Sequence, residues 1–143
     1  MDGTGKEQLC GKINDLPMID PGMHMLGGEK RIVFGPERFW PTHVMRCFTL
    51  KPGGKAASNH HPWVHWFVCI AGQGKFQIGD DVYDIGAGYW VYVPEEIPHS
   101  FWNTSETEDL ISLCTVTKEG DTDPLALTLS LIHISEPTRH AQI

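Results

Sequence analysis

Short apolar runs separated by turn residues dominate the chain from Lys30 onward. Runs rich in Val, Ile, Phe, Tyr and Trp alternate with Gly, Pro and Asp, a pattern typical of an all-β domain. This part of the sequence shows no sustained helical period. The pattern predicts nine strands, at residues 30–35, 42–51, 56–61, 64–72, 74–80, 81–86, 89–94, 99–105 and 109–117. Strands of this number and spacing indicate a β-sandwich or a jelly-roll barrel.

The composition is that of one soluble globular domain. Of the 143 residues, 41% are hydrophobic and 20% are charged. We expect the domain at residues 30–121, after an irregular N-terminal arm at residues 1–29 that is rich in Gly, Met and Pro. The net charge of −7 argues against a nucleic-acid or anionic-membrane partner, and no apolar run has membrane-spanning length. Scattered cysteines and the lack of a secretory signal pattern predict a cytoplasmic protein.

The C-terminal stretch does not read like native protein. The run "LSLIHISEPTR" at residues 129–139 matches the translation of a transposase adapter used in sequencing libraries. We therefore interpret residues 129–143 as an adapter read-through artefact and exclude His133 and His140 from any site. Residues 122–128 are then expected to be a truncated native C-terminal segment.

Three histidines stand close together in the stretch "NHHPWVHW" that begins at Asn59. Side chains alternate between the two faces of a strand, so Asn59, His61 and His65 share one face. His60 points the other way unless a bulge or the following proline resets the count. Farther along the chain, His99 follows a proline-bounded turn and begins a later strand. Imidazoles that converge from separate strands suit a first-row divalent metal such as Zn, Cu, Fe or Ni, and tolerate Mn where the geometry imposes it.

The spacing of these residues resembles that of the cupins. It is most similar to small single-domain cupins with an HxHPWEHE motif and a four-histidine, manganese-type metal site. The general first cupin motif, G-x5-H-x-H-x3,4-E-x6-G, aligns with Gly53, Asn59, His61, His65 and Gly72. The second motif, G-x5-P-x-G-x2-H-x3-N, aligns with Gly88, Pro94, Glu96, His99 and Asn103. The resemblance covers about residues 30–121 and implies a double-stranded β-helix, the jelly-roll barrel of the cupins.

Carried over residue by residue, the resemblance implies that His61, His65 and His99 ligate one divalent transition metal (Mn, Fe, Ni, Cu or Zn). Asn59 stands where the family has its first ligand histidine, which leaves three alternatives open. The amide oxygen of Asn59 ligates, water takes the position, or His60 swings in through a bulge. A further alternative is a degenerate site in which the histidines line a dry pocket.

Aromatic residues with the inward parity of the histidines are expected to line the pocket, namely Trp63, Phe67 and Phe101. No side chain is placed well enough to be named a catalytic acid or base. The sequence therefore predicts a metal-dependent cupin enzyme, of the oxygenase or lyase type, that acts on a small organic molecule. The alternative is a non-catalytic cupin that binds or senses a small ligand. The resemblance also implies a homodimer, which the strand at residues 30–35 could form through its edge.

Overall fold

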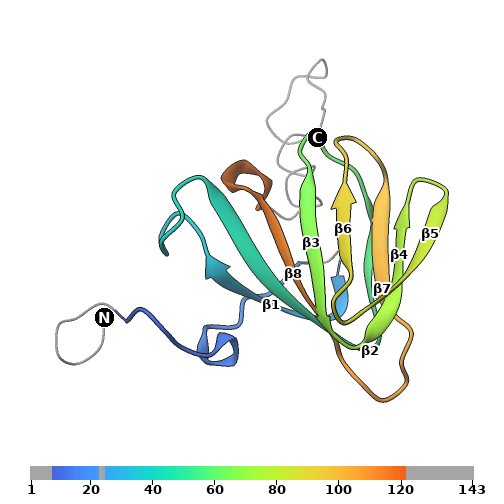
Figure 1. The fold of residues 1–143 in the computed structure, drawn as a ribbon, viewed down its shortest axis with the longest axis horizontal. Coiled ribbons are helices and arrows are strands. Elements are labelled where there is room, and N and C mark those ends of the chain that lie inside the picture. The colour runs from blue at the N-terminus through green and yellow to red at the C-terminus, as the bar shows by residue number, and fades with distance from the viewer. Residues whose placement is uncertain (1–7, 23–24, 122–143) are drawn as a thin grey trace.

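The structure, a computed structural model, describes residues 8–22 and 25–121 (Figure 1). Within these residues the chain forms eight strands and two short 3-10 helices, and no helix there is long and apolar enough to cross a membrane. The elements are η1 (Ile13–Asp15), β1 (Met25–Phe34), β2 (His43–Asn59), β3 (His65–Ala71), β4 (Gln73–Ile78), β5 (Asp81–Gly86), β6 (Trp90–Val93), β7 (His99–Asn103), β8 (Leu110–Thr117) and η2 (Lys118–Gly120). The predictions made for residues 122–128 and 129–143 lie outside the described residues.

The strands form one sheet that curls into a nearly closed barrel (Figure 1). The strand order is β5-β4-β7-β2-β8-β3-β6, and β1 pairs with β2 outside this path. All of these pairings are antiparallel. Strands far apart in the sequence, such as β2 and β7, are therefore neighbours, as in a jelly roll. The predicted all-β jelly-roll architecture is confirmed.

The core lies inside the barrel and follows from the two-residue period of the strands. On β3, His65, Phe67 and Cys69 are buried, whereas the intervening side chains are exposed. The ring of Phe67 packs edge-on against those of Phe76 and Phe101, at centroid distances of 4.9 and 5.1 Å. Such contacts between inward side chains hold the two sides of the barrel together.

The predicted break between the strands at 42–51 and 56–61 is wrong, because β2 runs without interruption from His43 to Asn59. The "KPGG" stretch at residues 51–54 is a bulge on the edge towards β1. Gly28 pairs with Leu50 but Leu26 pairs with Lys55, so four residues of β2 lie opposite Gly27 alone, three more than in a regular ladder. Gly53 has a φ of 81°, which a residue with a side chain rarely adopts.

The start of β1 and the end of β2 also differ from the prediction. β1 begins at Met25, so the last five residues of the segment predicted to be irregular, 25–29, belong to the sheet. β2 ends at Asn59, which places His60 and His61 in the loop before β3. The proline that follows them has no N–H to donate to a strand ladder, which explains the early end of the strand.

Gly74 on β4 has no room for a side chain. A Cβ atom there would overlap the carbonyl oxygen of Trp102 on β7, whereas one at Gly86 on β5 would lie 3.6 Å from the nearest atom, the carbonyl oxygen of Gly72. Gly74→Ala is expected to lower the free energy of unfolding by about 1–3 kcal/mol, because overpacking forces the backbone to shift. Gly86→Ala should change it by less than about 1 kcal/mol. Urea unfolding followed by tryptophan fluorescence measures both, and equal effects would contradict the close approach of β4 to β7.

Candidate metal centre

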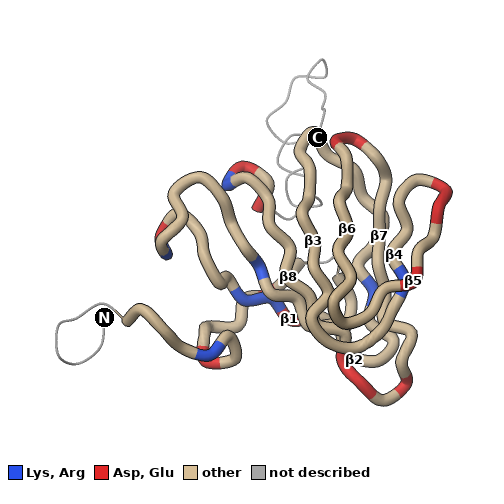
Figure 2. Tube along the Cα trace, viewed as in Figure 1, with Lys and Arg blue, Asp and Glu red and all other residues tan. Residues whose placement is uncertain are grey.

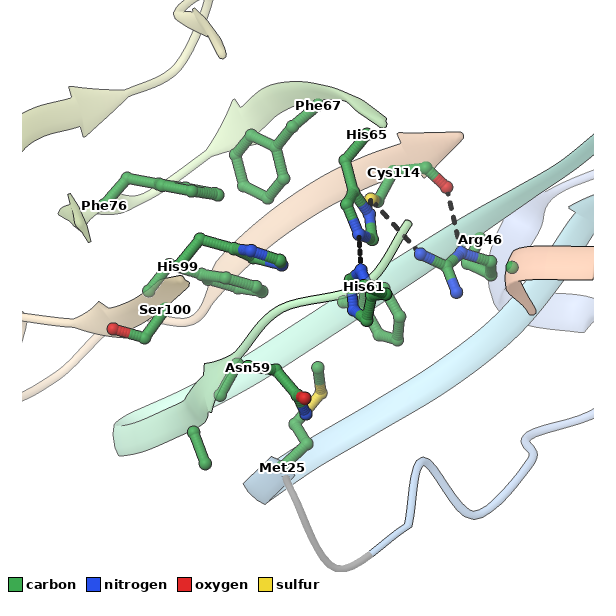
Figure 3. A pocket seen from close by; sticks show the side chains of 15 residues that line it. Met25, Arg46, Asn59, His61, His65, Phe67, Phe76, His99, Ser100 and Cys114 are labelled. Carbon is green, nitrogen blue, oxygen red and sulfur yellow. Dashed lines mark hydrogen bonds between the residues drawn. The ribbon is translucent and has the colours of Figure 1, made fainter. Parts of the chain in front are cut away.

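Three histidine rings meet inside the barrel (Figure 3). His65 and His99 are the first residues of β3 and β7, and His61 lies in the loop between β2 and β3. The ring centroids are 4.8 to 5.0 Å apart, and one ligand nitrogen of each ring lies within 4.8 Å of the other two. Side chains from three separate segments thus form a cluster that could hold one metal ion.

Backbone pairing sets the positions of the three rings. Asn59, the last residue of β2, pairs with His99 on β7. The loop that carries His61 is tied to the turn before β7, because the backbone N–H of Glu96 donates to the carbonyl oxygen of His61 at 2.7 Å. His61 therefore reaches the cluster from a loop held by this hydrogen bond, and not through strand alternation as the sequence analysis assumed.

Hydrogen bonds also determine which nitrogen of each ring faces the centre. Nδ1 of His99 lies 3.0 Å from the carbonyl oxygen of Ile97, which can only accept, so Nδ1 carries the proton and Nε2 keeps its lone pair. Nδ1 of His65 lies 3.4 Å from Sγ of Cys114, which leaves Nε2 of His65 towards the cluster. This Nε2 is 3.3 Å from Nδ1 of His61.

The donor set fits a divalent transition metal. Two nitrogen ligands of a tetrahedral ion, with bonds of about 2.1 Å, lie about 3.4 Å apart. The His61–His65 separation of 3.3 Å matches this value before any ion is bound. Neutral imidazole is a good ligand for Zn, Cu, Fe and Ni.

Burial keeps His65 and His99 neutral near neutral pH. His61 and His65 are 6% and 8% exposed. Burial is the main cause that lowers the pKa of His65 to about 2, and electrostatic interactions with His99, Arg46 and His61 contribute to this shift. Burial also lowers the pKa of His99, against a raising effect of its hydrogen bond to Ile97. Near neutral pH a cation would therefore not have to displace an added proton from His65 or His99.

The cluster opens onto a cavity of about 60 Å³. Phe67 and Phe101 line this cavity together with Phe76, Ser100 and Met25, so its wall is largely apolar. Trp63 does not line the cavity. It instead stacks on His61, with ring centroids 4.6 Å apart and planes 8° from parallel. Trp63 therefore supports the His61 ring where the sequence analysis expected a pocket wall.

Of the two residues that could replace the missing ligand histidine, one lines the cavity and the other lies at the surface. Asn59 lines the cavity, and its Oδ1 accepts a hydrogen bond of 3.2 Å from the backbone N–H of His60. The side chain of His60 is 58% exposed, and its Nδ1 lies 3.4 Å from a carboxylate oxygen of Glu96. The structure therefore brings Asn59 to the cluster and leaves His60 at the surface.

Arg46 lines the same cavity and was missed in the sequence analysis. It is 6% exposed, and it lies on β2 with Phe48 and Leu50, which are also buried. The sequence did contain a signal for it, because Arg46 has the same parity as Phe48 and Leu50 and should therefore point inward. A charged residue that points into an apolar core needs a buried hydrogen-bond or charge partner. Its Nε donates to the carbonyl oxygen of Cys114 at 3.1 Å, and its Nη2 lies 3.3 Å from Sγ of Cys114.

Comparison with known proteins shows what the chain is similar to. Residues 46–116 match the family model of the cupin domain. The solved structure of the polyketide cyclase RemF from Streptomyces resistomycificus superposes with a TM-score of 0.70 at 16% identity, over 78% of this chain and 80% of RemF. A predicted oxalate decarboxylase from Thermotoga maritima gives a TM-score of 0.66 at 18% identity, over 76% of this chain and 98% of that one. The barrel has the jelly-roll fold of the cupins, and about half of the chain is similar to the cupin domain.

A curated relative covers part of the same region. Protein SchB of Streptomyces halstedii is 26% identical over 84 residues, which cover 57% of this chain and 61% of SchB. The chain thus spans about three fifths of the length of that relative.

The buried, neutral state of His65 makes stability depend on pH. Its pKa is about 2 in the folded protein, against about 6.5 in an unfolded chain. Below about pH 6.5 the unfolded chain binds a proton that the folded protein does not, so the folded state loses stability as the pH falls, by at most about 1.4 kcal/mol per pH unit for this group. In chelator-treated protein, the free energy of unfolding in urea should decrease from about pH 6.5 to about pH 4.5, and less steeply in His65→Gln. Identical pH profiles for the two proteins would contradict the assignment.

Proposed function

We propose that this chain is a metal-dependent cupin enzyme, of the oxygenase or lyase type, that acts on a small organic molecule in the barrel cavity. One observation carries the proposal. Three imidazoles, of which His65 and His99 have pKa values lowered by burial, place one nitrogen each within 4.8 Å of the others, at the wall of a cavity. A site with three protein ligands and open positions is the catalytic arrangement, whereas closed four-ligand sites are structural.

The residues around the cavity would have different roles at such a site. A divalent ion bound there would supply a positive charge that polarises an oxygen of the substrate. His61, His65 and His99 would hold the ion, with His65 and His99 oriented by their Nδ1 contacts to Cys114 and Ile97. The phenyl rings around the cavity would exclude water and take up the carbon part of the substrate.

Similar structures support an enzyme that acts on a small molecule. RemF is described as a polyketide cyclase and the Thermotoga maritima protein as a predicted oxalate decarboxylase. Decarboxylation is a lyase reaction, in line with one of the two reaction types proposed for this chain. Similarity of fold at this level of identity determines neither the substrate nor the metal. We propose that the metal is one of Mn, Fe, Ni, Cu or Zn.

The metal content of purified variants tests the proposal. The wild-type protein is expected to bind about one equivalent of a divalent transition metal, measured by elemental analysis after gel filtration. His61→Ala and His99→Ala should lose it, because each removes one of three ligands. His43→Ala is the matched control, since His43 stacks on Trp40 and does not line the cavity. A wild-type protein that binds no added metal, or retention of full metal in both site variants, would overturn the proposal.

The second candidate function is that of a non-catalytic cupin that binds or senses a small ligand. It is favoured by Asn59, which stands in place of a ligand histidine and whose Oδ1 is already engaged by the backbone of His60. In that case, the histidines would form part of a degenerate site.

Restoring the first ligand distinguishes a three-histidine centre from a degenerate one. Asn59 lines the cavity beside His99, its partner in the β2–β7 pairing. Asn59→His is therefore expected to tighten zinc binding by about tenfold or more, because imidazole is a stronger ligand than an amide oxygen. Asn59→Ala serves as the size control and should not tighten binding. Zinc affinity from competition with a chelator gives the comparison, and equal affinities of wild type and Asn59→His would speak against a ligand position at residue 59.

We also propose that the protein is a cytoplasmic homodimer, paired through β1. In the described part of the chain β1 pairs with β2 on one edge, and its other edge has only the bridge between Ile19 and Lys30. A strand edge with unpaired backbone groups is suited to pairing with a second copy. The net charge of −7 supports neither a nucleic-acid nor an anionic-membrane partner.

A further inference from the structure

Arg46 is the one charged side chain in the cavity wall formed by the described residues. Its guanidinium reaches from β2 towards Cys114 and His61 (Figure 3). Arg46 and His65 contact the same atom, Sγ of Cys114, at 3.3 and 3.4 Å. The guanidinium therefore lies one side chain away from the histidine cluster.

The guanidinium has more N–H donors than acceptors around it in the described part of the chain. Within the described residues, Nε donates to the carbonyl oxygen of Cys114, Nη1 to Asp121 and Nη2 to the sulfur of Cys114. An arginine carries five N–H groups, so one N–H on each Nη has no acceptor in this part of the chain. The sulfur is moreover a weak acceptor. A buried arginine with two unmatched N–H groups at a cavity wall is arranged to receive an oxygen ligand.

The charges around Arg46 leave an excess of positive charge. Asp121 lies 3.2 Å from Nη1 of Arg46, but it is also 2.9 Å from Nζ of Lys30, so one carboxylate is shared between two cations. Burial raises the pKa of Asp121, yet these two cations and their hydrogen bonds outweigh it and lower the pKa overall, so the carboxylate is charged near neutral pH.

No acidic residue of the described chain lines the cavity. Figure 2 shows that acidic residues lie mainly in turns, such as those between β4 and β5 and between β7 and β8. A cation bound to three neutral imidazoles would thus keep its full charge beside the positive charge of Arg46. Both charges favour an anion in the cavity.

The size of the cavity limits that anion. A volume of about 60 Å³ is enough for about four to six water-sized atoms, at 10–15 Å³ for each. A carboxylate group with one to three further carbon or oxygen atoms fills it. The rings of Phe67, Phe76 and Phe101 form the apolar part of the wall, where a short carbon chain would lie.

We propose that Arg46 is the carboxylate-binding residue of this cavity and that the ligand is a small carboxylate of about four to six non-hydrogen atoms. The carboxylate binds the unmatched N–H groups of Arg46, and a second oxygen of the same molecule faces the histidine cluster. This inference rests on the proposed function, because the cation at the histidines supplies the second point of attachment. Arg46 thereby determines specificity for acids over neutral analogues.

Binding of glycolate to zinc-loaded protein tests the inference. Glycolate carries one carboxylate and one hydroxyl oxygen, and zinc is diamagnetic, so a titration followed by ¹⁵N–¹H NMR shifts gives a dissociation constant. Arg46→Met is expected to weaken glycolate binding by about 10- to 100-fold, the effect of losing a charge-assisted hydrogen-bond pair. Glycolamide, the neutral analogue, should bind wild type and Arg46→Met equally weakly. Arg46→Lys keeps a positive charge opposite Asp121 and should give an intermediate affinity.

Lys75→Met is the matched control. It removes the lysine of another ion pair, with Asp84, but neither residue lines the cavity, so glycolate affinity should stay within about twofold of wild type. Zinc stoichiometry and thermal unfolding of each variant show that it is folded and loaded. Zinc-loaded Arg46→Met or Arg46→Lys that binds glycolate as tightly as wild type would overturn the role of Arg46 and leave the metal site intact. A wild type that binds no zinc would overturn the proposed function instead, and the same titration of metal-free protein then tests Arg46 alone.

Discussion

The register of β2 against β7 is the constraint on which the site depends. It places the end of β2 beside His99, and the hydrogen bond from Glu96 to the carbonyl oxygen of His61 fixes the loop that follows β2. The two segments are separated in the sequence by β3 to β6, so only the folded barrel brings them together. A shift of the register by one residue would turn His99 to the opposite face of its strand and break the cluster.

The chemistry of the site follows from burial. Water is largely excluded from His65, which disfavours its protonated form and leaves a lone pair that a cation can use. Burial would normally exclude Arg46 as well, yet it is retained through its contacts with Cys114 and Asp121. The barrel thus encloses several nitrogen groups and no carboxylate along the described cavity wall. We infer that the histidine nitrogens bind a cation, and that this cation and Arg46 together then favour an anion in the cavity.

Local patterns in the sequence predicted much of this structure. Features that depend on contacts between residues far apart in the sequence were not predicted. Alternation and turn residues located most strands, and motif spacing selected the three histidines that the barrel brings together. The bulge at Gly53 was not predictable, because the pairing with β1 keeps that segment in the sheet. Whether His60 or His61 turns inward depends on a hydrogen bond from a distant turn. Arg46 could have been found from its parity with Phe48, but its partners lie on β8 and beyond.

We propose that three imidazoles distant in the sequence bind the same ion. X-ray absorption spectroscopy of the zinc-loaded protein is the decisive experiment, because multiple scattering counts the imidazole ligands. We expect three imidazole nitrogen atoms at about 2.0–2.1 Å, with oxygen donors in the remaining positions. A spectrum with one imidazole or none, or with sulfur as a main ligand, would contradict it.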